Sequence, residues 1–335
     1  MNELITALKN PTAYPHPVQG ITVISTHISD ILLTGNFAYK ICKPVNLGFA
    51  DFSTAEKRKE QCLKEFKVNT MLSPDLYYGV VPITKERTGA VVISGKGEVI
   101  DYAIKMKQLP PDCTMDKLLD KNMVGPNHMR ALAARIHTYH YIANASPEIS
   151  KFGEVSAIQF NWDENFAQTK ERIPDIISQE DFSFIQNKVN SFTRNNRALF
   201  DRRVQTNKIK QGHGDFHSGN IFIVGRDMYV FDAIVFNMRF PCCDVVADIA
   251  FMAMDLDFHQ RHDLADMFIG VYQQFSSDND IATLLPFYTC YYAYVRGKVN
   301  CFMLNDQQLD DSSRQKITEK AKSYFALAKK YAESL

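Results

Sequence analysis

This sequence of 335 residues has a formal net charge of zero, no C-x-x-C motif and no long apolar run. Lys plus Arg and Asp plus Glu number 38 each, so no long-range electrostatic footprint for nucleic acid or an anionic membrane is expected. The seven cysteines are scattered and none forms C-x-x-C, which predicts reduced thiols in a cytoplasmic protein. The longest apolar run is interrupted by Asp248 and Asp255, so no membrane span is expected. MNELITALKNPTAYPHP has no basic segment before an apolar run, so we expect no signal peptide.

Strand patterns dominate the first hundred residues. Gly35-Asn36 is a two-residue hairpin signal between two of the expected strands. In residues 99–108 apolar and polar side chains alternate, which predicts a strand with one buried face. Ser53 and Glu56 make a capping-box pattern that predicts a helix over about 54–72. The strands are expected at 21–26, 31–34, 37–42, 80–84, 90–94 and 99–108.

Helical periods dominate after Pro110-Pro111, with one strand-rich island at 209–236. We therefore expect a β-rich lobe over 1–108, a hinge at about 106–110 and a mostly helical lobe over 109–335. Helices are expected at about 114–121, 126–144, 178–202, 244–256, 261–276, 280–302 and 311–333.

The island carries three oxygen-bearing side chains with a suggestive spacing. Asp215 and Asn220 lie five residues apart, so one short loop can aim both into one site. Asp232 follows a two-strand hairpin and returns to the end where that hairpin starts. Phosphoryl transfer needs a carboxylate that orients the acceptor hydroxyl and oxygen ligands that hold Mg²⁺ on the phosphates. The island therefore predicts Asp215 as the catalytic residue, with Asn220 and Asp232 as metal ligands.

The motif HGD-x-x-x-x-N at 213–220 resembles the aminoglycoside phosphotransferase family and its choline and fructosamine kinase relatives. D-V-V-A-D-I-A at 244–250 and LAARIHTYH at 132–140 resemble two helices of that family. The resemblance implies a bilobal, protein-kinase-like α+β fold, with a nucleotide-binding first lobe and a catalytic, acceptor-binding second lobe. It also implies transfer of the γ-phosphoryl group from ATP or GTP, with Mg²⁺, to a hydroxyl of a small-molecule acceptor.

Several further pieces look more closely like a group of bacterial phosphotransferase-like proteins that are often fused to a P-loop ATPase domain. These pieces are LTGNFAYKICKPV, DFSTAEKRK, YAIKMKQLP and GDFHSGNI. The sequence contains no G-x-x-x-x-G-K-[ST], so the resemblance implies a separate ATPase as a partner.

A nucleotide site of this kind needs a lysine on the phosphates and a helix glutamate that holds the lysine. Lys40 and Lys43 are both candidates, and Ala38 before Lys40 fits the A-x-K pattern of kinases, so Lys40 is preferred. For the glutamate, Glu65 is preferred because it precedes Val68, Leu72 and Pro74 much as the family's glutamate precedes its L-x-x-L and proline. The other candidates are Glu56 and Glu60.

Two further nucleotide contacts follow from the resemblance. There is no G-x-G-x-x-G, and the loop after the first strand carries Ser29 as a candidate phosphate contact, as in the Ser-bearing loop of the aminoglycoside kinases. The hinge predicts adenine contacts through backbone groups of Lys107 and Leu109, because Pro110 has no N–H to donate.

Several other polar residues are expected to have structural roles. His213 is expected to pack the catalytic loop, and Asp244 and Asp248 to lie on one helix face with Asp244 bracing that loop. The acidic stretch 254–268 would suit a cationic acceptor, although a solvated helix face explains it as well. The tyrosines at 288–294 fit either a pocket or core.

Two other functions compete with a kinase. His213, Asp215 and His217 resemble a metal cluster, which His137 and His140 could extend, so a metal-dependent hydrolase is one alternative. The other is a nucleotide-binding scaffold without catalysis. Metal content of the purified protein separates the first alternative from a kinase, and nucleotide binding without turnover would identify the second.

Overall fold

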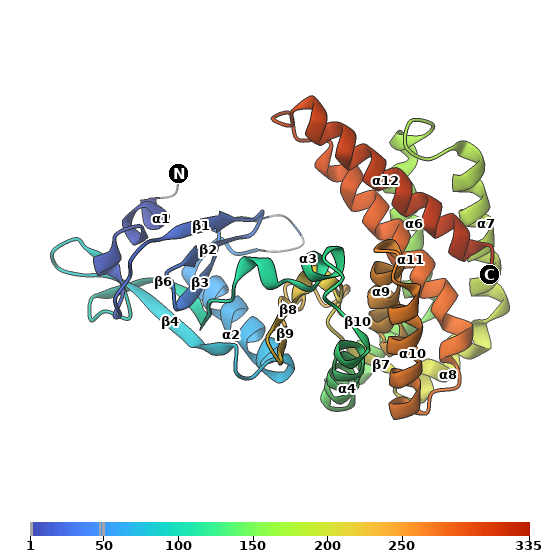
Figure 1. The fold of residues 1–335 in the computed structure, drawn as a ribbon, viewed down its shortest axis with the longest axis horizontal. Helices are drawn as coiled ribbons and strands as arrows, with labels where there is room; N and C mark the ends of the chain where they lie inside the picture. The colour runs from blue at the N-terminus through green and yellow to red at the C-terminus, as the bar shows by residue number, and fades with distance from the viewer. Residues whose placement is uncertain (1–2, 47, 49–50) are drawn as a thin grey trace. The chain divides into compact units, whose positions relative to one another are not determined.

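The structure is a computed structural model that describes residues 3–46, 48 and 51–335. The chain forms two compact units (Figure 1). The first contains Met1–Met115 and Asn220–Met238, and the second contains Asp116–Gly219 and Arg239–Leu335. The hairpin that follows the 213–220 motif therefore belongs with the N-terminal residues.

A six-stranded antiparallel sheet forms the centre of the first unit, in the order β1-β2-β3-β6-β4-β5. The predicted hairpin turn is confirmed: Leu33 pairs with Ala38, and Gly35 adopts φ +99°, which glycine tolerates best. The strands are β1 (Thr22–Ser25), β2 (Ser29–Leu33), β3 (Phe37–Cys42), β4 (Tyr77–Lys85), β5 (Val91–Ile93) and β6 (Glu98–Lys107).

Both faces of this sheet are covered, so the prediction of one buried face for β6 is wrong. Ala103 is fully buried in an apolar cluster with Leu8 of α1 (Glu3–Leu8), a short helix that the sequence patterns did not reveal. A second cluster contains Ile104 together with Cys62 of α2 (Ala55–Leu72). The alternation in β6 was real, but it could not show that N-terminal residues cover the other face.

The start of α2 differs from the predicted capping box. Its N-cap is Thr54, whose hydroxyl accepts a hydrogen bond from the Lys57 amide at 3.3 Å. Ser53 instead donates its hydroxyl to the Asp51 carboxylate at 2.6 Å. Ser53 and Thr54 are both residue types that favour the N-cap position. Because the Ser53 hydroxyl is bonded to Asp51, Thr54 caps the helix.

Helices make up most of the second unit. The helix predicted over 178–202 is two helices, because Asn196 leaves helical geometry (φ −105°, ψ 19°) between α7 and α8. Helix α6 was missed: its N-cap, Glu154, makes no side-chain capping bond. The longer helices are α4 (Pro126–Ile142), α6 (Val155–Thr169), α7 (Gln179–Asn195), α8 (Arg197–Gln205), α9 (Val245–Phe258), α10 (His262–Ser276), α11 (Ile281–Met303) and α12 (Asp311–Ala332).

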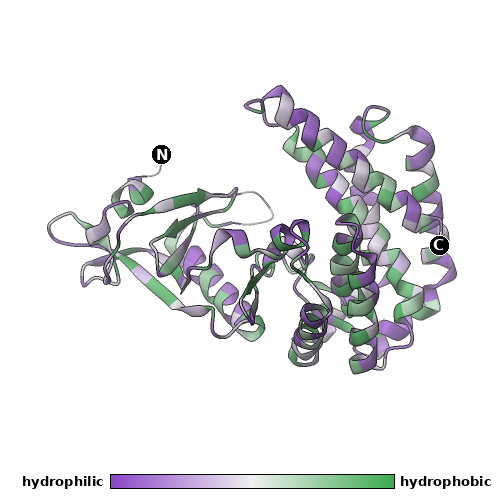
Figure 2. Ribbon diagram, in the orientation of Figure 1, coloured by the Kyte–Doolittle hydropathy of each residue, from purple (hydrophilic) through white to green (hydrophobic). Residues whose placement is uncertain are grey.

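Helices α9 and α11 form the core of the second unit. Every residue from Val245 to Leu256 is buried, so α9 is surrounded on all sides. Helix α12 packs along α11 and has only one buried stripe, and Figure 2 shows hydrophilic and hydrophobic residues mixed along it. Among the described residues, no helix has the length and apolar character that crossing a membrane requires.

Candidate active site

Three charged side chains from distant parts of the sequence meet in the first unit. Lys40, on the central strand β3, places its Nζ 2.7 Å from Oε1 of Glu65 and 2.6 Å from Oδ1 of Asp232. Glu65 comes from α2, and Asp232 comes directly after the hairpin of β8 (Ile221–Val224) and β9 (Asp227–Val230). The lysine and glutamate predicted to pair are therefore brought together with one predicted metal ligand.

Burial and the neighbouring charges both shift the pKa values of Lys40 and Glu65 in this triad. Burial lowers the pKa of Lys40, but the two facing carboxylates raise it by more, so the pKa lies well above its usual value. Burial raises the pKa of Glu65, and the attraction of Lys40 only partly offsets this. The side chain of Asp232 is 49% exposed, so the triad has one open carboxylate.

The competing residues do not join this triad. Lys43 bonds instead to the β1–β2 turn: its Nζ lies 2.7 Å from the Ser25 hydroxyl and 3.6 Å from the Asp30 carboxylate. Glu56 and Glu60 are exposed on α2. The geometry thus favours Lys40 and Glu65 among the candidates.

Asn220 and Asp232 lie at the same end of one hairpin. Ile221 pairs with Val230, and the Phe231 amide donates to the carbonyl of Asn220 at 3.1 Å, so Asp232 follows directly beside it. Asp232 adopts φ +64°, a left-handed conformation that costs a residue other than glycine about 1 kcal/mol or more. One carboxylate and one amide oxygen form the hard-oxygen donor set that Mg²⁺ prefers. These residues therefore fit the predicted metal.

The loop that carries Asp215 is braced by Asp248 in the second unit. The carboxylate of Asp248 accepts hydrogen bonds from the amides of His213 (2.6 Å) and Gly214 (2.9 Å). It also accepts one from Nε2 of His140 at 3.1 Å. Burial raises the pKa of Asp248, but these partners lower it by more. The prediction that Asp244 braces the loop is wrong, because Asp248 does so.

Asp244 has a different structural task. It caps the start of α9 by accepting from the Val246 amide at 2.9 Å. Arg203 donates to both of its carboxylate oxygens at 2.7 Å and to Asp278 at 2.6 and 2.7 Å. Sequence spacing alone could not separate the two aspartates, because both lie near the start of one helix.

Backbone geometry fixes the loop further. Gly214 adopts φ +79°, and a Cβ there would lie 2.9 Å from the Cα of Pro241, so only glycine fits without displacement. His213 is fully buried, and its Nδ1 accepts from the Asp215 amide at 3.2 Å. His213 therefore packs the loop, as the sequence predicted.

The side chain of Asp215 is 37% exposed and faces His217. The Nδ1 of His217 accepts from the Gly219 amide at 3.1 Å, which leaves Nε2 to donate toward Asp215 at 3.5 Å. Burial raises the pKa of Asp215, but His217, Arg296 and His213 outweigh it and lower the pKa to about 2. Burial lowers the pKa of His217, and the facing carboxylates raise it by more. Asp215 is thus ionised at neutral pH and suited to orienting a hydroxyl.

The remaining predicted contacts have definite places in the first unit. Ser29 begins β2 and is 2% exposed, and its amide donates to the Thr26 hydroxyl at 3.1 Å. The amide of Lys107 donates to the Leu76 carbonyl at 2.8 Å, so that N–H is already used in a backbone hydrogen bond. Leu109 is 9% exposed. The roles of Ser29, Lys107 and Leu109 toward a nucleotide stay predictions.

The acidic stretch of α9 and α10 does not form one acidic surface. Asp255 is buried and accepts from the Ser218 amide at 2.8 Å, whereas Asp257 accepts from the Tyr331 hydroxyl. Asp263 pairs with Arg261, and Asp266 is exposed. Tyr288, Tyr292 and Tyr294 are buried, as core residues are. These contacts give no support to a cationic acceptor.

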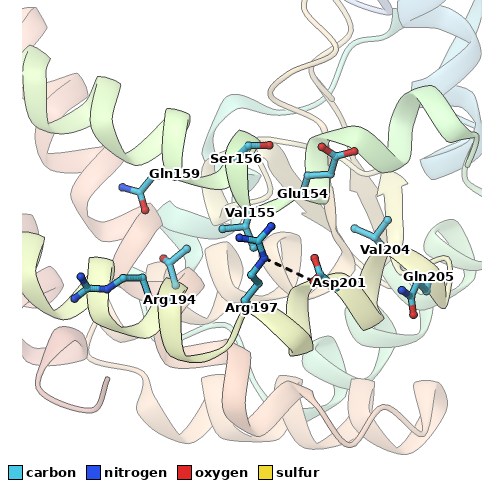
Figure 3. A pocket seen from close by; sticks show the side chains of 10 residues that line it. Glu154, Val155, Ser156, Gln159, Arg194, Arg197, Asp201, Val204 and Gln205 are labelled. Atoms are coloured by element: carbon cyan, nitrogen blue, oxygen red, sulfur yellow. Dashed lines mark ion pairs between the residues drawn. The ribbon is translucent and has the colours of Figure 1, made fainter.

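A pocket of about 640 Å³ lies in the second unit (Figure 3). It is formed by α6, α7 and α8, and Arg197 and Asp201 approach each other on its wall at 4.0 Å. None of the predicted site residues lines it.

Two histidines of the hydrolase alternative, His140 and His213, have structural partners. His140 bonds through both ring nitrogens, to Asp248 and to the Tyr272 hydroxyl at 2.7 Å. Among residues 3–46, 48 and 51–335, no three His, Cys, Asp or Glu side chains form a group that could hold a metal ion. A site that Mg²⁺ enters together with phosphates, through Asn220 and Asp232, is a different kind of site from such a cluster.

No pattern in the sequence predicted the buried ion pair between Arg58 and Asp101. Arg58 of α2 donates through Nε to both carboxylate oxygens of Asp101 on β6, at 2.9 and 3.0 Å. Arg58 also donates to the Phe52 carbonyl at 2.9 Å. This pair fixes the first turns of the helix that carries Glu65.

Comparison with known proteins identifies the fold. A choline kinase from Cryptosporidium parvum superposes with a TM-score of 0.57 at 12% identity, covering 100% of this chain and 96% of that one. A choline/ethanolamine kinase family protein from Mesorhizobium loti gives a TM-score of 0.54 at 10% identity, covering 99% and 98%. The chain therefore has the bilobal kinase-like α+β fold that the sequence predicted.

Curated relatives are more similar in sequence. Uncharacterized proteins of Mycobacterium tuberculosis and Mycobacterium bovis are 30% identical over 293 residues, which is 87% of this chain. The chain spans 57% of the length of these relatives. No protein-family model matches the chain.

Proposed function

We propose that this chain is a phosphotransferase that moves the γ-phosphoryl group of ATP or GTP, with Mg²⁺, to a hydroxyl of a small-molecule acceptor. The observation that carries the proposal is the contact of Lys40 with both Glu65 and Asp232. A fold shared with choline kinases is compatible with it, but function has to be argued from the site.

In this proposal the first unit binds the nucleotide. Lys40 contacts the phosphates, and Glu65 holds the lysine in place. Asn220 and Asp232 hold Mg²⁺, which would neutralise charge on the phosphates when bound. Ser29 contributes to the phosphate contacts, and backbone groups of Lys107 and Leu109 contact the base.

Asp215 orients the acceptor hydroxyl in line with the γ-phosphorus. Its lowered pKa, about 2, suits orientation more than storage of a proton, because the carboxylate stays ionised throughout the neutral range. The partner implied by the sequence resemblance, a separate P-loop ATPase, belongs to the same proposal.

Turnover assays test the proposal directly. ATP and GTP consumption with Mg²⁺ should rise above the basal rate with at least one acceptor from a library of sugars, alcohols and amino alcohols. Asp215→Asn should remove this rise. Nucleotide binding without consumption across the library would favour the scaffold alternative. Stoichiometric zinc or iron in the purified protein, with indifference to ATP, would favour the hydrolase.

A further inference from the structure

Helix α2 presents an unusual buried face. A helix that packs on a sheet normally buries an apolar stripe, but α2 buries Arg58, Glu65 and Asn69 beside its apolar residues, and Ser73 caps its end. Buried polar groups cost free energy unless they are hydrogen-bonded. Their partners therefore show what this face is built to hold.

The last three of these residues are connected to one short segment, 230–233: Asn69 and Ser73 bond to it directly, and Glu65 is linked to it through Lys40. Glu65, Asn69 and Ser73 are spaced four apart, one helical turn each, and so form one stripe. Glu65 reaches Asp232 through Lys40, as described above. The hydroxyl of Ser73 lies 2.8 Å from both the amide and the carbonyl of Val230.

Asn69 supplies the middle contact, and it is completely buried. Its Oδ1 accepts a hydrogen bond from the Ala233 amide at 3.0 Å. Its Nδ2 donates to the carbonyl of Glu65 at 2.9 Å, and this second bond fixes which way the amide group faces. Asn69 thus connects the turn that carries Glu65 to the residue directly after Asp232.

This contact matters because of the backbone at Asp232. The left-handed φ of +64° is uncommon outside glycine, and the amide that follows it belongs to a residue only 4% exposed. Without Asn69 that amide would be a buried donor lacking its acceptor, and the strained conformation would lose a bond that holds it.

We propose that Asn69 is a positioning residue that holds Asp232 in the conformation required to bind Mg²⁺. The inference rests on the proposed function, because it takes Asp232 as a metal ligand. Outer partners that orient a metal ligand typically change metal affinity by about 10–100-fold when removed.

The test compares Asn69→Leu with Val68→Ala by calorimetry, using Mg²⁺ and a non-hydrolysable ATP analogue. Leucine branches at Cγ as asparagine does but is bulkier and offers no acceptor to Ala233. Val68 is the adjacent buried residue of α2, so its truncation controls for general loosening of the helix. Asn69→Ala serves as a second variant if leucine prevents folding, and melting temperatures are recorded for all.

We expect Asn69→Leu to raise the Mg²⁺ concentration for half-saturation by about 10–100-fold, whereas Val68→Ala leaves it near wild type. In an Asp232→Asn background, Asn69→Leu should cause no further change, because both substitutions then affect the same ligand.

Equal Mg²⁺ dependence in Asn69→Leu and Val68→Ala would overturn the inference while leaving the proposed function intact. An additional loss in the Asp232→Asn background would also overturn it. A wild type whose nucleotide binding ignores Mg²⁺ would instead contradict the proposed function itself.

Discussion

Each unit contains a cluster of charged side chains, and the two clusters differ in net charge and in exposure to solvent. In the second unit Arg203 lies between Asp244 and Asp278, and Lys208 adds a second cation 3.2 Å from Asp278. Both carboxylates are almost fully buried, with side-chain exposures of 0% and 3%. Asp280 lies 3.7 Å from Arg203 and 2.8 Å from Arg202, so three cations and three carboxylates make this cluster neutral, as expected of charges that only hold segments together.

The cluster in the first unit is not balanced in this way. Among the described residues, Lys40 is the only cation in an ion pair with Glu65 and Asp232, so carboxylates outnumber cations there, and the Asp232 side chain is 49% exposed. An excess carboxylate open to solvent can accept a cation, whereas a neutral buried cluster cannot. The comparison teaches that net charge and exposure, more than the number of ion pairs, distinguish the proposed binding site from the structural cluster.

Substitutions in the cluster of Lys40, Glu65 and Asp232 should have the largest effect on nucleotide turnover. Lys40→Ala and Asp232→Asn should each abolish nucleotide turnover, because one removes the proposed phosphate contact and the other a proposed metal ligand. Circular dichroism and melting temperature would check that the variants fold. Lys43→Ala is the matched control, since Lys43 bonds to the β1–β2 turn instead. Full activity in Lys40→Ala with loss in Lys43→Ala would reverse the assignment.

Asp215→Asn should have the next largest effect. We expect transfer, or basal ATP hydrolysis as its proxy, to fall by about two to four orders of magnitude. The nucleotide dissociation constant should change by less than about tenfold, since Asp215 is proposed to contact the acceptor. Calorimetry beside the rate assay separates these quantities. A loss of nucleotide affinity as large as the loss of rate would argue against this role.

Breaking the neutral cluster should affect stability instead of binding. Arg203→Met leaves Asp244 and Asp278 without their main partner and should lower the free energy of unfolding by about 3–5 kcal/mol. Urea denaturation measures this loss. At low temperature, where the variant is still folded, its affinity for nucleotide should match wild type. A selective loss of affinity would show that the two clusters are not as different as their charges indicate.

The smallest effect is a pH dependence from Asp215 and His217. Because the folded state raises the pKa of His217, this pair stabilises the fold fully below the ordinary histidine pKa of about 6.5 and progressively less as pH rises through the folded pKa. Asp215→Asn removes the nearest carboxylate. Its stability deficit relative to wild type should therefore be largest in mild acid and shrink toward alkaline pH. NMR titration of the His217 ring should give a lower pKa in the variant.

Patterns of neighbouring residues in the sequence correctly predicted the features that form within a single turn, helix or hairpin. The turn at Gly35, the helix of Glu65 and the return of Asp232 beside Asn220 all follow from spacing within one element or one hairpin. The same reasoning selected Lys40 over Lys43 from the small residue two positions earlier.

The errors and omissions within the candidate site depend on contacts between distant segments, unlike the local ones at Ser53, at Asn196 and at the start of α6. The bracing of the loop was predicted for Asp244 instead of Asp248, because the partners of Asp248, His140 and the amide of His213, lie 108 and 35 residues away. The Asn69 contact to Ala233 spans 164 residues, so no local pattern marks it.

Calorimetric titration of ATP into the wild type and Asp232→Asn, each with and without Mg²⁺, tests the central claim most directly. The account predicts that Mg²⁺ strengthens nucleotide binding to the wild type and has little effect on Asp232→Asn, because the open carboxylate beside Lys40 would no longer hold the metal. Equal binding with and without Mg²⁺ in the wild type, or an undiminished effect of Mg²⁺ in Asp232→Asn, would contradict it.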